Sequence, residues 1–174
     1  SIIRNAEICI NLKTTWDSKK SYLKRSIYTF NAELIEIIKK SSSIKKYILF
    51  SGLGTEKRST LRNEIISKTE ELITKELNNS IIIRPSVILG NGDQFLSNLL
   101  PIFKMSFFIP LFGDGSKKFQ PVLIDDIVEF LSKMIEETDL KEKLFELGGP
   151  NIFTYKEFYS KIAEKMNKKK VFVP

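Results

Sequence analysis

Apolar residues in the first half of the chain follow two alternating periods. Residues 7–12 (EICINL) alternate between apolar and polar positions and predict a strand, whereas 21–40 carries apolar residues three and four apart and predicts an amphipathic helix. Residues 45–52 (KKYILFSG) predict a short buried strand that ends in small residues. A second helix over 61–77 and a third strand over 80–84 follow, so the predicted order is strand, helix, strand, helix, strand.

This alternation predicts the fold class. Apolar strands joined by amphipathic helices favour an α/β fold, with a Rossmann-like parallel sheet, right-handed crossovers and flanking helices. The chain has 174 residues, of which 42% are hydrophobic, and this is enough for one domain with a real core. We therefore expect a single domain over residues 1–174.

The second half predicts shorter elements. We expect Asp125 or Asp126 to cap the helix that follows them, and Thr154 with Glu157 to form a capping box before the last helix. The last helix is expected to turn Phe158, Ile162, Ala163 and Met166 inward. The other expected elements are a helix at 94–104, an apolar loop at 105–112, a strand within 113–126 after a Gly-rich turn, and a strand within 143–150.

Three predicted strand ends are candidates for a ligand site. They are Asn11-Leu12, Ser51-Gly52 and Arg84-Pro85-Ser86. Ligands of open parallel sheets bind beyond the carboxyl ends of the strands, so these residues could line one crevice. The alternative is that small and turn residues merely end the strands. The segments GNGD and GDGS do not follow a strand and open a helix in the G-x-G-x-x-G manner, which makes both turns and leaves the dinucleotide fingerprint absent.

Composition restricts the chemistry. The chain has no histidine, the commonest general base and zinc ligand, so catalysis would depend on Tyr, Lys, Ser or carboxylates. Its single cysteine, Cys9, lies in an apolar segment; it excludes an intramolecular disulfide and fits core packing in a reducing compartment. We predict no metal site.

The net charge and one apolar segment leave two questions open. The net charge of +7 arises from lysines spread in small groups, which fits either a solvated surface or a basic patch for an acidic partner. The segment MSFFIPLF (105–112) is too short to span a membrane and contains a proline. Its phenylalanines either pack under neighbouring loops or face a partner or membrane.

Three segments carry a resemblance to a known family. They are RPSVILGNGDQFLSNLLPIF, FFIPLFGDGSKKFQPVLIDDIVEFL and LFELGGPNIFTYKEF, with AEICINL and YILFSGLGTEK as weaker support. Together these segments resemble the extended short-chain dehydrogenase/reductase (NAD-dependent epimerase/dehydratase) superfamily. Within it they look like the nucleotide-binding accessory subunit of respiratory complex I (NADH:ubiquinone oxidoreductase) and its bacterial relatives.

The resemblance implies a Rossmann-like domain that holds NAD(H) or NADP(H), of which this chain would be the C-terminal portion. The chain begins at what looks like the fourth strand of that fold, so the phosphate-binding βαβ part would be missing and cofactor binding incomplete. Residues 86–174 would include the smaller subregion on the substrate or partner side. The implied cofactor-binding residues are Leu12, Ser51, Lys68, Pro85 and Val87, although Lys68 fits a solvated helix lysine equally well.

The catalytic pair of the superfamily has no counterpart in the chain. Active members use Tyr-x-x-x-Lys, in which the lysine lowers the pKa of the tyrosine. If Lys68 is the lysine, Glu64 stands in place of the tyrosine; in the other register Thr60 replaces the tyrosine and Glu64 the lysine. No tyrosine occurs between Tyr47 and Tyr155, so neither register restores the pair, and we predict no catalytic residue.

These observations favour a noncatalytic, dinucleotide-binding accessory or assembly subunit of complex I. The alternatives are an active oxidoreductase, epimerase or dehydratase acting on a nucleotide sugar, and an RNA-binding relative, which the spread of the charge disfavours. The expected partners are a dinucleotide, other complex I subunits and an anionic membrane surface. The expected location is the cytoplasm or inner-membrane periphery of a bacterium, or the matrix side of the mitochondrial inner membrane.

Overall fold

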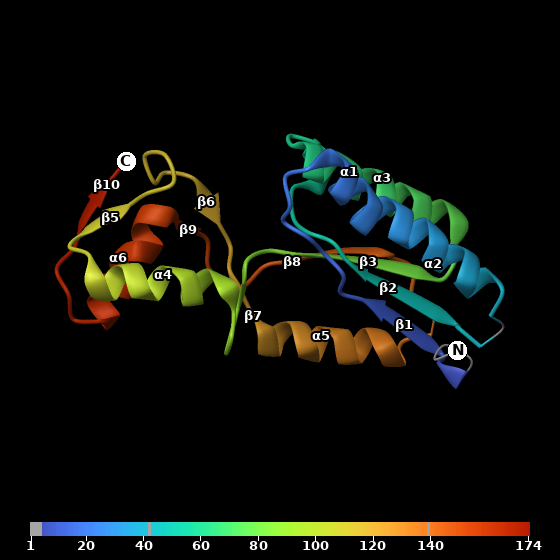
Figure 1. Ribbon diagram of the computed structural model, residues 1–174. Coiled ribbons are helices and arrows are strands. Elements are labelled where there is room, and N and C mark those ends of the chain that lie inside the picture. The colour runs from blue at the N-terminus through green and yellow to red at the C-terminus, as the bar shows by residue number, and fades with distance from the viewer. Residues whose placement is uncertain (1–4, 42, 139) are drawn as a thin grey trace. The chain divides into compact units, whose positions relative to one another are not determined.

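The chain divides into two compact units. The computed structural model describes residues 5–41, 43–138 and 140–174 (Figure 1). Unit 1 comprises Ser1–Pro85 and Ile135–Glu146, and unit 2 comprises Ser86–Met134 and Leu147–Pro174. Unit 2 starts at the same residue as the predicted subregion 86–174, whereas the count of one domain stays a prediction.

Unit 1 is built on a four-stranded sheet in the order β1-β2-β3-β8. β1 pairs with β2 in parallel, with Asn11 opposite Leu49, and β2 pairs with β3 in parallel, with Phe50 opposite Ile83. The predicted α/β class, with a parallel sheet and flanking helices, is confirmed. The strands are β1 (Ile8–Asn11), β2 (Lys46–Phe50), β3 (Ser80–Pro85) and β8 (Leu144–Leu147).

The helices that follow β1 and β2 lie together on one face of this sheet (Figure 1). They are α1 (Lys20–Leu23), the π-helical segment η2 (Lys24–Thr29), α2 (Phe30–Lys39), the short 3-10 helix η3 (Thr55–Lys57) and α3 (Leu61–Glu76). The sequence predicted one amphipathic helix over 21–40, and the structure adds the wide π-helical turn within it. Apolar spacing did not reveal this turn, because residues four apart share a face in either helix type.

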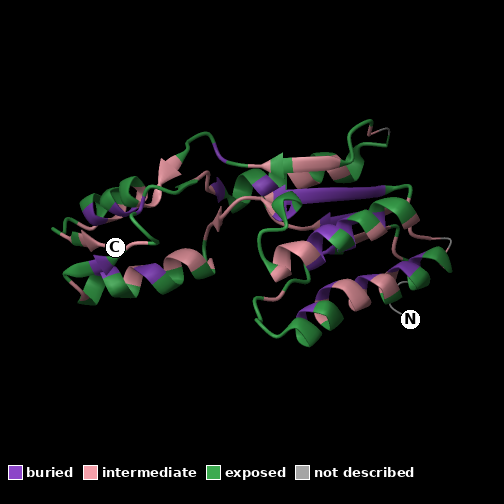
Figure 2. Cartoon of the chain, turned by 90° about the horizontal axis from the view of Figure 1, so that it is seen from above, coloured by how far each residue is buried: buried purple, intermediate pink, exposed green. Residues whose placement is uncertain are grey.

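The core of unit 1 forms where these helices meet the sheet. Ile35, Ile38, Tyr47, Leu49 and Ile73 make one buried cluster, and Cys9 packs against it as a free, partly buried thiol. Figure 2 shows the buried residues concentrated along the strands and on the facing sides of the helices. A second cluster joins α1 and η2 to α3 through Leu23, Ile27, Ile65 and Ile66.

Unit 2 combines helices with two-stranded pairings. Its elements are β4 (Ile88–Leu89), α4 (Gln94–Met105), β5 (Phe108–Pro110), β6 (Lys118–Phe119), β7 (Val122–Leu123), β9 (Phe153–Thr154), α6 (Tyr155–Lys165) and β10 (Val171–Val173). Helix α5 (Ile124–Glu136) begins here. The strands pair as β4 with β7, β5 with β10, and β6 with β9. The core gathers Leu99, Phe103, Ile109, Tyr159 and Ala163, so the inward face predicted for the last helix is confirmed.

The helix caps predicted from the sequence were partly correct. Thr154 and Glu157 form the predicted capping box, with both reciprocal hydrogen bonds present. The prediction that Asp125 or Asp126 caps α5 was wrong, because the helix already begins at Ile124 and both carboxylates lie in its first turn. They still favour the helix there through its dipole.

The apolar segment at 105–112 is not the predicted loop. It contains β5, which pairs in parallel with β10, so that Ile109 lies opposite Phe172. This pairing joins segments about 60 residues apart, and no local period could indicate it. Among the described helices, none combines the length and apolar character that crossing a membrane requires.

We predict that two isoleucines on neighbouring helices differ sharply in their contribution to stability. Ile73→Ala removes a side chain that is 0% exposed and should lower the free energy of unfolding by about 2–5 kcal/mol. Ile37→Ala removes one that is 49% exposed and should change it by less than about 1 kcal/mol. Urea denaturation of both variants measures the difference, and equal losses would contradict the assigned core.

Candidate functional site

The carboxyl ends of β1, β2 and β3 lie at one edge of the sheet. Because the strands are parallel and in register, Leu12, Ser51 and Pro85 end neighbouring strands on the same side. The Ser51 amide donates to the Ile83 carbonyl at 2.7 Å, and the Leu53 amide donates to the Pro85 carbonyl at 3.2 Å. The structure therefore brings three of the five predicted cofactor residues to a shared edge.

The loop after β1 is held against α3 by an arginine. Arg62 Nε donates to the Thr15 carbonyl at 2.8 Å, and Arg62 Nη2 donates to Thr14 Oγ1 at 2.8 Å. The Arg62 guanidinium also lies over the Trp16 ring, 4.0 Å from its centroid, while Trp16 remains 83% exposed. With Leu12 65% exposed, the loop presents apolar surface at the strand-end edge.

A buried polar triad fixes the end of β1. Asn11 Nδ2 donates to Asn31 Oδ1 at 2.9 Å and to Tyr47 Oη at 2.8 Å, and the Tyr47 hydroxyl donates to Asn31 Oδ1 at 2.7 Å. Burial is the main cause that raises the pKa of Tyr47 far above the ordinary value of a phenol. Tyr47 is therefore a neutral structural group within the core of unit 1.

Glu70 and Arg84 form a buried ion pair next to Ser51. Arg84 Nη2 contacts Glu70 Oε2 at 2.6 Å and Arg84 Nε donates to Glu70 Oε1 at 3.1 Å, which makes the pair bidentate. The hydroxyl groups of Ser51 and Thr55 also donate to Glu70. Hydrogen bonding to Glu70 is the main cause that raises the pKa of Arg84. The Ser51 hydroxyl proton is thus directed into the protein, away from any ligand at the edge.

Glu70 is the residue of this cluster that the sequence did not indicate. It is 4% exposed, although α3 carries other glutamates at solvated positions. The available signal was Arg84, a charged residue that directly follows three isoleucines of a buried strand and therefore needs a buried carboxylate partner. Arg84 is also within reach of Glu146 and Glu56, at 3.2 and 3.4 Å.

Lys68 has a carboxylate partner on its own helix. Its Nζ lies 2.6 Å from Glu64 Oε1 in an exposed i,i+4 ion pair, and the hydrogen bond to Lys68 is the main cause that lowers the pKa of Glu64. Within the described residues, no hydrogen bond joins Lys68 to Leu12, Ser51 or Pro85. Glu64 is therefore an ionised hydrogen-bond acceptor beside the lysine.

Val87 lies in unit 2, just before β4. Its carbonyl accepts a hydrogen bond from the Val122 amide at 2.9 Å. The chain then turns at Gly92, which has a φ of 82°, and Asp93 caps α4 by accepting from the Leu96 amide at 2.6 Å. The segment GNGD is thus a turn, as predicted, but it lies between β4 and α4, and the helix cap formed by Asp93 was not predicted.

Each unit has a hollow among its described residues. The first, in unit 1, has a volume of about 20 Å³ between Lys13, Thr14, Asn31, Ser51 and Thr69, enough for about one water molecule. A dinucleotide would therefore lie along the exposed edge rather than inside the sheet. The second, an open hollow of about 650 Å³ in unit 2, lies beside the α6 capping box. In the described part of the chain, no cluster of His, Cys, Asp or Glu could hold a metal ion.

Alignments with several curated proteins cover most of the length of this chain. It is 28% identical over 160 residues to NADH dehydrogenase [ubiquinone] 1 alpha subcomplex subunit 9, mitochondrial, of Arabidopsis thaliana, covering 90% of this chain and 40% of the relative. The mouse protein of the same name is 25% identical, with 86% and 40% covered. The NADH-ubiquinone oxidoreductase 40 kDa subunit of Neurospora crassa is 20% identical, with 97% and 44% covered.

The predicted resemblance to an accessory subunit of complex I is confirmed. The chain spans less than half the length of these relatives. No family model matches the chain.

Solved structures show the fold. UDP-glucuronic acid 4-epimerase from Bacillus cereus, in complex with UDP-glucuronic acid and NAD, has a TM-score of 0.83 at 14% identity and covers 99% of this chain and 63% of that chain. dTDP-glucose 4,6-dehydratase from Bacillus anthracis, in complex with NAD, has a TM-score of 0.78 at 17% identity, with 99% and 62% covered. The Rossmann-like architecture predicted from the sequence is therefore confirmed.

We predict that the Glu70–Arg84 pair is far more costly to break than an exposed pair. Arg84→Met leaves Glu70 buried without its partner and should lower the free energy of unfolding by about 3–5 kcal/mol. Removing both charges with Arg84→Met and Glu70→Met should cost less than Arg84→Met alone. Arg58→Met, which breaks the exposed pair with Glu71, should cost less than about 1 kcal/mol. Additive losses in a urea double-mutant cycle would refute the coupling.

We also predict that Lys68 controls the titration of Glu64. The lowered pKa means that the ion pair stabilises the fold above the ordinary carboxyl pKa, and that this contribution disappears as the pH falls through the lowered value. In Lys68→Met the pKa of Glu64 should rise toward its ordinary value in an NMR side-chain titration. Lys133→Met, in the matched Glu129–Lys133 pair, should raise the pKa of Glu129 and leave that of Glu64 unchanged.

Proposed function

We propose that this chain is part of a noncatalytic, NAD(P)(H)-binding accessory or assembly subunit of respiratory complex I. The observation that carries the proposal is the set of relatives, which are named as subunits of NADH dehydrogenase or NADH-ubiquinone oxidoreductase and match 86–97% of the chain. The names of these relatives include the word mitochondrial. For a eukaryotic subunit we propose the matrix side of the mitochondrial inner membrane, and for a bacterial one the cytoplasm or the periphery of the inner membrane.

The strand-end edge supports dinucleotide binding. In open parallel sheets a dinucleotide lies across the carboxyl ends of neighbouring strands, and here Leu12, Ser51 and Pro85 occupy such ends. The exposed Leu12 and Trp16 offer an apolar surface for a planar ring at this edge. Lys68 and Val87 are the further contacts that we propose for the cofactor.

The chemistry of the site supports binding without turnover. Proton transfer in the superfamily needs a phenol whose pKa is lowered by a nearby lysine, whereas Lys68 faces the carboxylate of Glu64. The buried phenol of Tyr47 has a raised pKa and is hydrogen-bonded within the core. In this role the bound dinucleotide would stabilise the folded subunit, because it binds the native state alone.

An active oxidoreductase, epimerase or dehydratase is the second candidate. The observation that favours it is the likeness to solved epimerase and dehydratase structures with TM-scores near 0.8. In such an enzyme the ionised Glu64 would be the base. Turnover of carbonyl or nucleotide-sugar substrates that disappears in Glu64→Ala would favour this candidate over the accessory subunit.

We predict that NADH binds and quenches the fluorescence of Trp16. Trp16 is the single tryptophan of the chain and lies in the loop at the proposed site, so its emission reports binding there without a label. Unfolding in urea should need about 2.7 kcal/mol more at an NADH concentration 100 times the Kd. Oxidation of NADH should not exceed the rate without protein.

Two results would contradict this prediction. Failure of NADH and NADPH to bind by calorimetry would refute the dinucleotide site, and binding that leaves Trp16 emission unchanged would place the ligand elsewhere. As a matched control, Trp16→Phe should abolish the fluorescence signal. Loss of assembled complex I on native gels after deletion of the chain tests the accessory role separately.

A further inference from the structure

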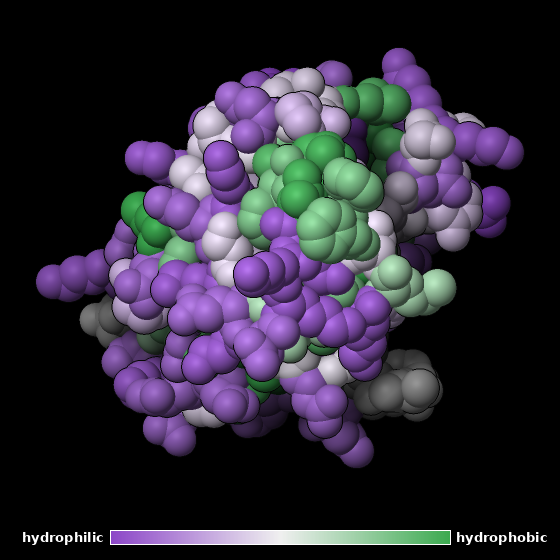
Figure 3. Space-filling model, turned by 90° about the vertical axis from the view of Figure 1, so that its left-hand side faces the viewer, coloured by the Kyte–Doolittle hydropathy of each residue, from purple (hydrophilic) through white to green (hydrophobic). Residues whose placement is uncertain are grey.

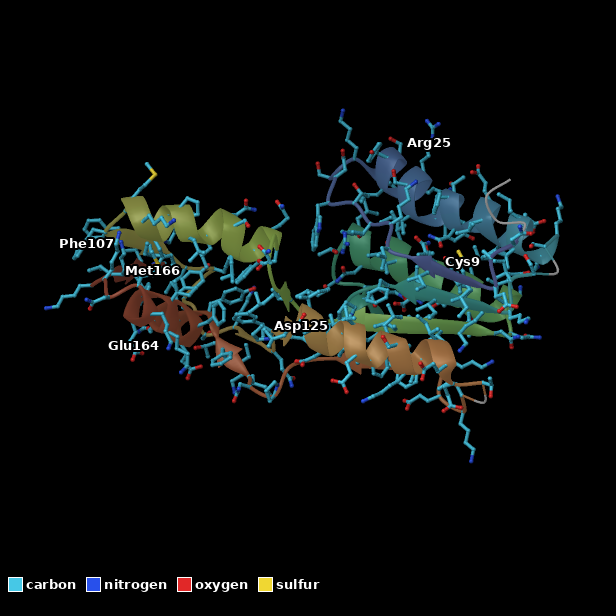
Figure 4. The ribbon with its side chains drawn as sticks, turned by 90° about the horizontal axis from the view of Figure 1, so that it is seen from below. Cys9, Arg25, Phe107, Asp125, Glu164 and Met166 are labelled. Carbon is cyan, nitrogen blue, oxygen red and sulfur yellow. The ribbon has the colours of Figure 1, made fainter. Side chains whose placement is uncertain are left out.

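One end of unit 2 exposes a group of large apolar side chains. The end patch, as we call it, consists of Met105, Phe107, Phe108 and Val171, which are 89, 54, 58 and 40% exposed. Figure 3 faces the side of the molecule that carries β5 and β10, and it shows a hydrophobic area bordered by hydrophilic surface. Figure 4 shows Phe107 at this end of the unit. Large exposed apolar patches mark sites of protein or membrane interaction.

The backbone holds these side chains outward. Phe108 lies in β5 opposite Val171 of β10, and the Val171 amide donates to the Phe107 carbonyl at 3.0 Å. Ile109 alternates with Phe108 along the strand and is 0% exposed, so the pleat that buries Ile109 turns Phe108 toward solvent. The rings of Phe107 and Phe108 meet edge to face, with centroids 5.3 Å apart. The exposure of Phe108 therefore follows from the β5–β10 pairing and not from a free loop.

Four lysines accompany the end patch: Lys104, Lys168, Lys169 and Lys170. Lys168 Nζ donates to the Lys104 carbonyl at 2.9 Å, and Lys170 Nζ donates to the Ser106 carbonyl, so both ammonium groups lie against the segment that bears the phenylalanines. Within the described residues, none of the four takes part in an ion pair. Loss of hydration and the charge of Lys168 lower the pKa of Lys170.

The neighbouring acidic group points elsewhere. Glu164 is the carboxylate closest in sequence to the lysine run, and Figure 4 shows it on α6, away from Phe107. Neither of the two hollows described above is lined by a residue of the end patch. The patch thus offers projecting apolar side chains, beside positive charge that no ion pair among the described residues neutralises.

We propose that the end patch docks on an anionic lipid bilayer. Phenylalanine and methionine side chains would enter the boundary between headgroups and acyl chains, and the lysines would contact anionic headgroups. A bilayer accepts projecting side chains without a complementary shape, whereas a protein partner needs a fitted surface with acidic groups opposite the lysines. The docking needs no dinucleotide, so it stands or falls separately from the cofactor site.

Flotation with lipid vesicles tests the proposal on the full chain. The chain should float with phosphatidylcholine vesicles that contain 30% phosphatidylserine and remain unbound with phosphatidylcholine alone. Replacing Lys168, Lys169 and Lys170 by Gln should weaken binding on the order of 100-fold, since each lysine near an anionic surface contributes about fivefold. Phe107→Ser with Phe108→Ser should weaken binding at least about tenfold while leaving the lysines in place.

A matched variant separates location from net charge. Lys57→Gln, Lys75→Gln and Lys141→Gln together remove an equal number of positive charges, three, from exposed positions of unit 1. This control variant should bind within about threefold of the unmodified chain. Circular dichroism and urea midpoints must match among all variants, which excludes unfolding as the cause of lost binding. Addition of NADH should leave flotation unchanged.

Several outcomes would overturn the proposal. Equal losses in the patch and control lysine variants would mean that charge acts without a defined surface. Equal binding to neutral vesicles would remove the role of anionic headgroups. Absence of flotation, together with a dimer in analytical ultracentrifugation that the Phe107→Ser, Phe108→Ser variant abolishes, would assign the patch to a second copy of this chain.

Discussion

A single buried ion pair joins the parts of unit 1 that form the candidate site. Glu70 comes from the middle of α3, Arg84 from the end of β3, and Ser51 from the residue after β2, and all three meet at one carboxylate. Breaking such a pair leaves an unpaired charge in the interior, so helix and strands can hardly move apart without a large cost. The geometry of the strand-end edge therefore depends on the buried carboxylate of Glu70.

This arrangement divides the polar groups of unit 1 between structure and binding. The hydroxyls of Ser51 and Tyr47 are engaged inside the protein, and the exposed ion pair of Glu64 with Lys68 remains on the surface of α3. What the edge offers outward is mainly backbone, apolar Leu12 and the Trp16 ring stacked on Arg62. Such a surface suits holding a flat ligand better than moving a proton, which is why we propose a subunit that binds without turnover.

The sequence predicted those features that local periodicity determines. Strands β1, β2 and β3 and helices α3 and α4 were predicted with small errors at their ends, because apolar spacing alone fixes which face is buried. The pairing of β5 with β10 was not predicted, because it depends on contacts between segments that are distant in the sequence. Glu70 was also missed, because a glutamate within a helix looks solvated until the position of Arg84 is known. The roles of Leu12, Ser51, Lys68, Pro85 and Val87 in cofactor binding stay predictions.

The π-helical segment η2 has a consequence for how the first long helix meets the sheet. The buried residues Leu23 of α1, Ile27 of η2, and Asn31 and Ile35 of α2 follow one another at steps of four. In a straight α-helix every step of four overshoots a full turn by about 40°, so three steps would carry Ile35 about 120° around the axis from Leu23. A π-turn rotates less per residue and absorbs part of this drift. The π-helical turn thus keeps residues at steps of four on one face of the helix. If η2 were a regular α-helix, Leu23 and Ile35 would lie on different faces.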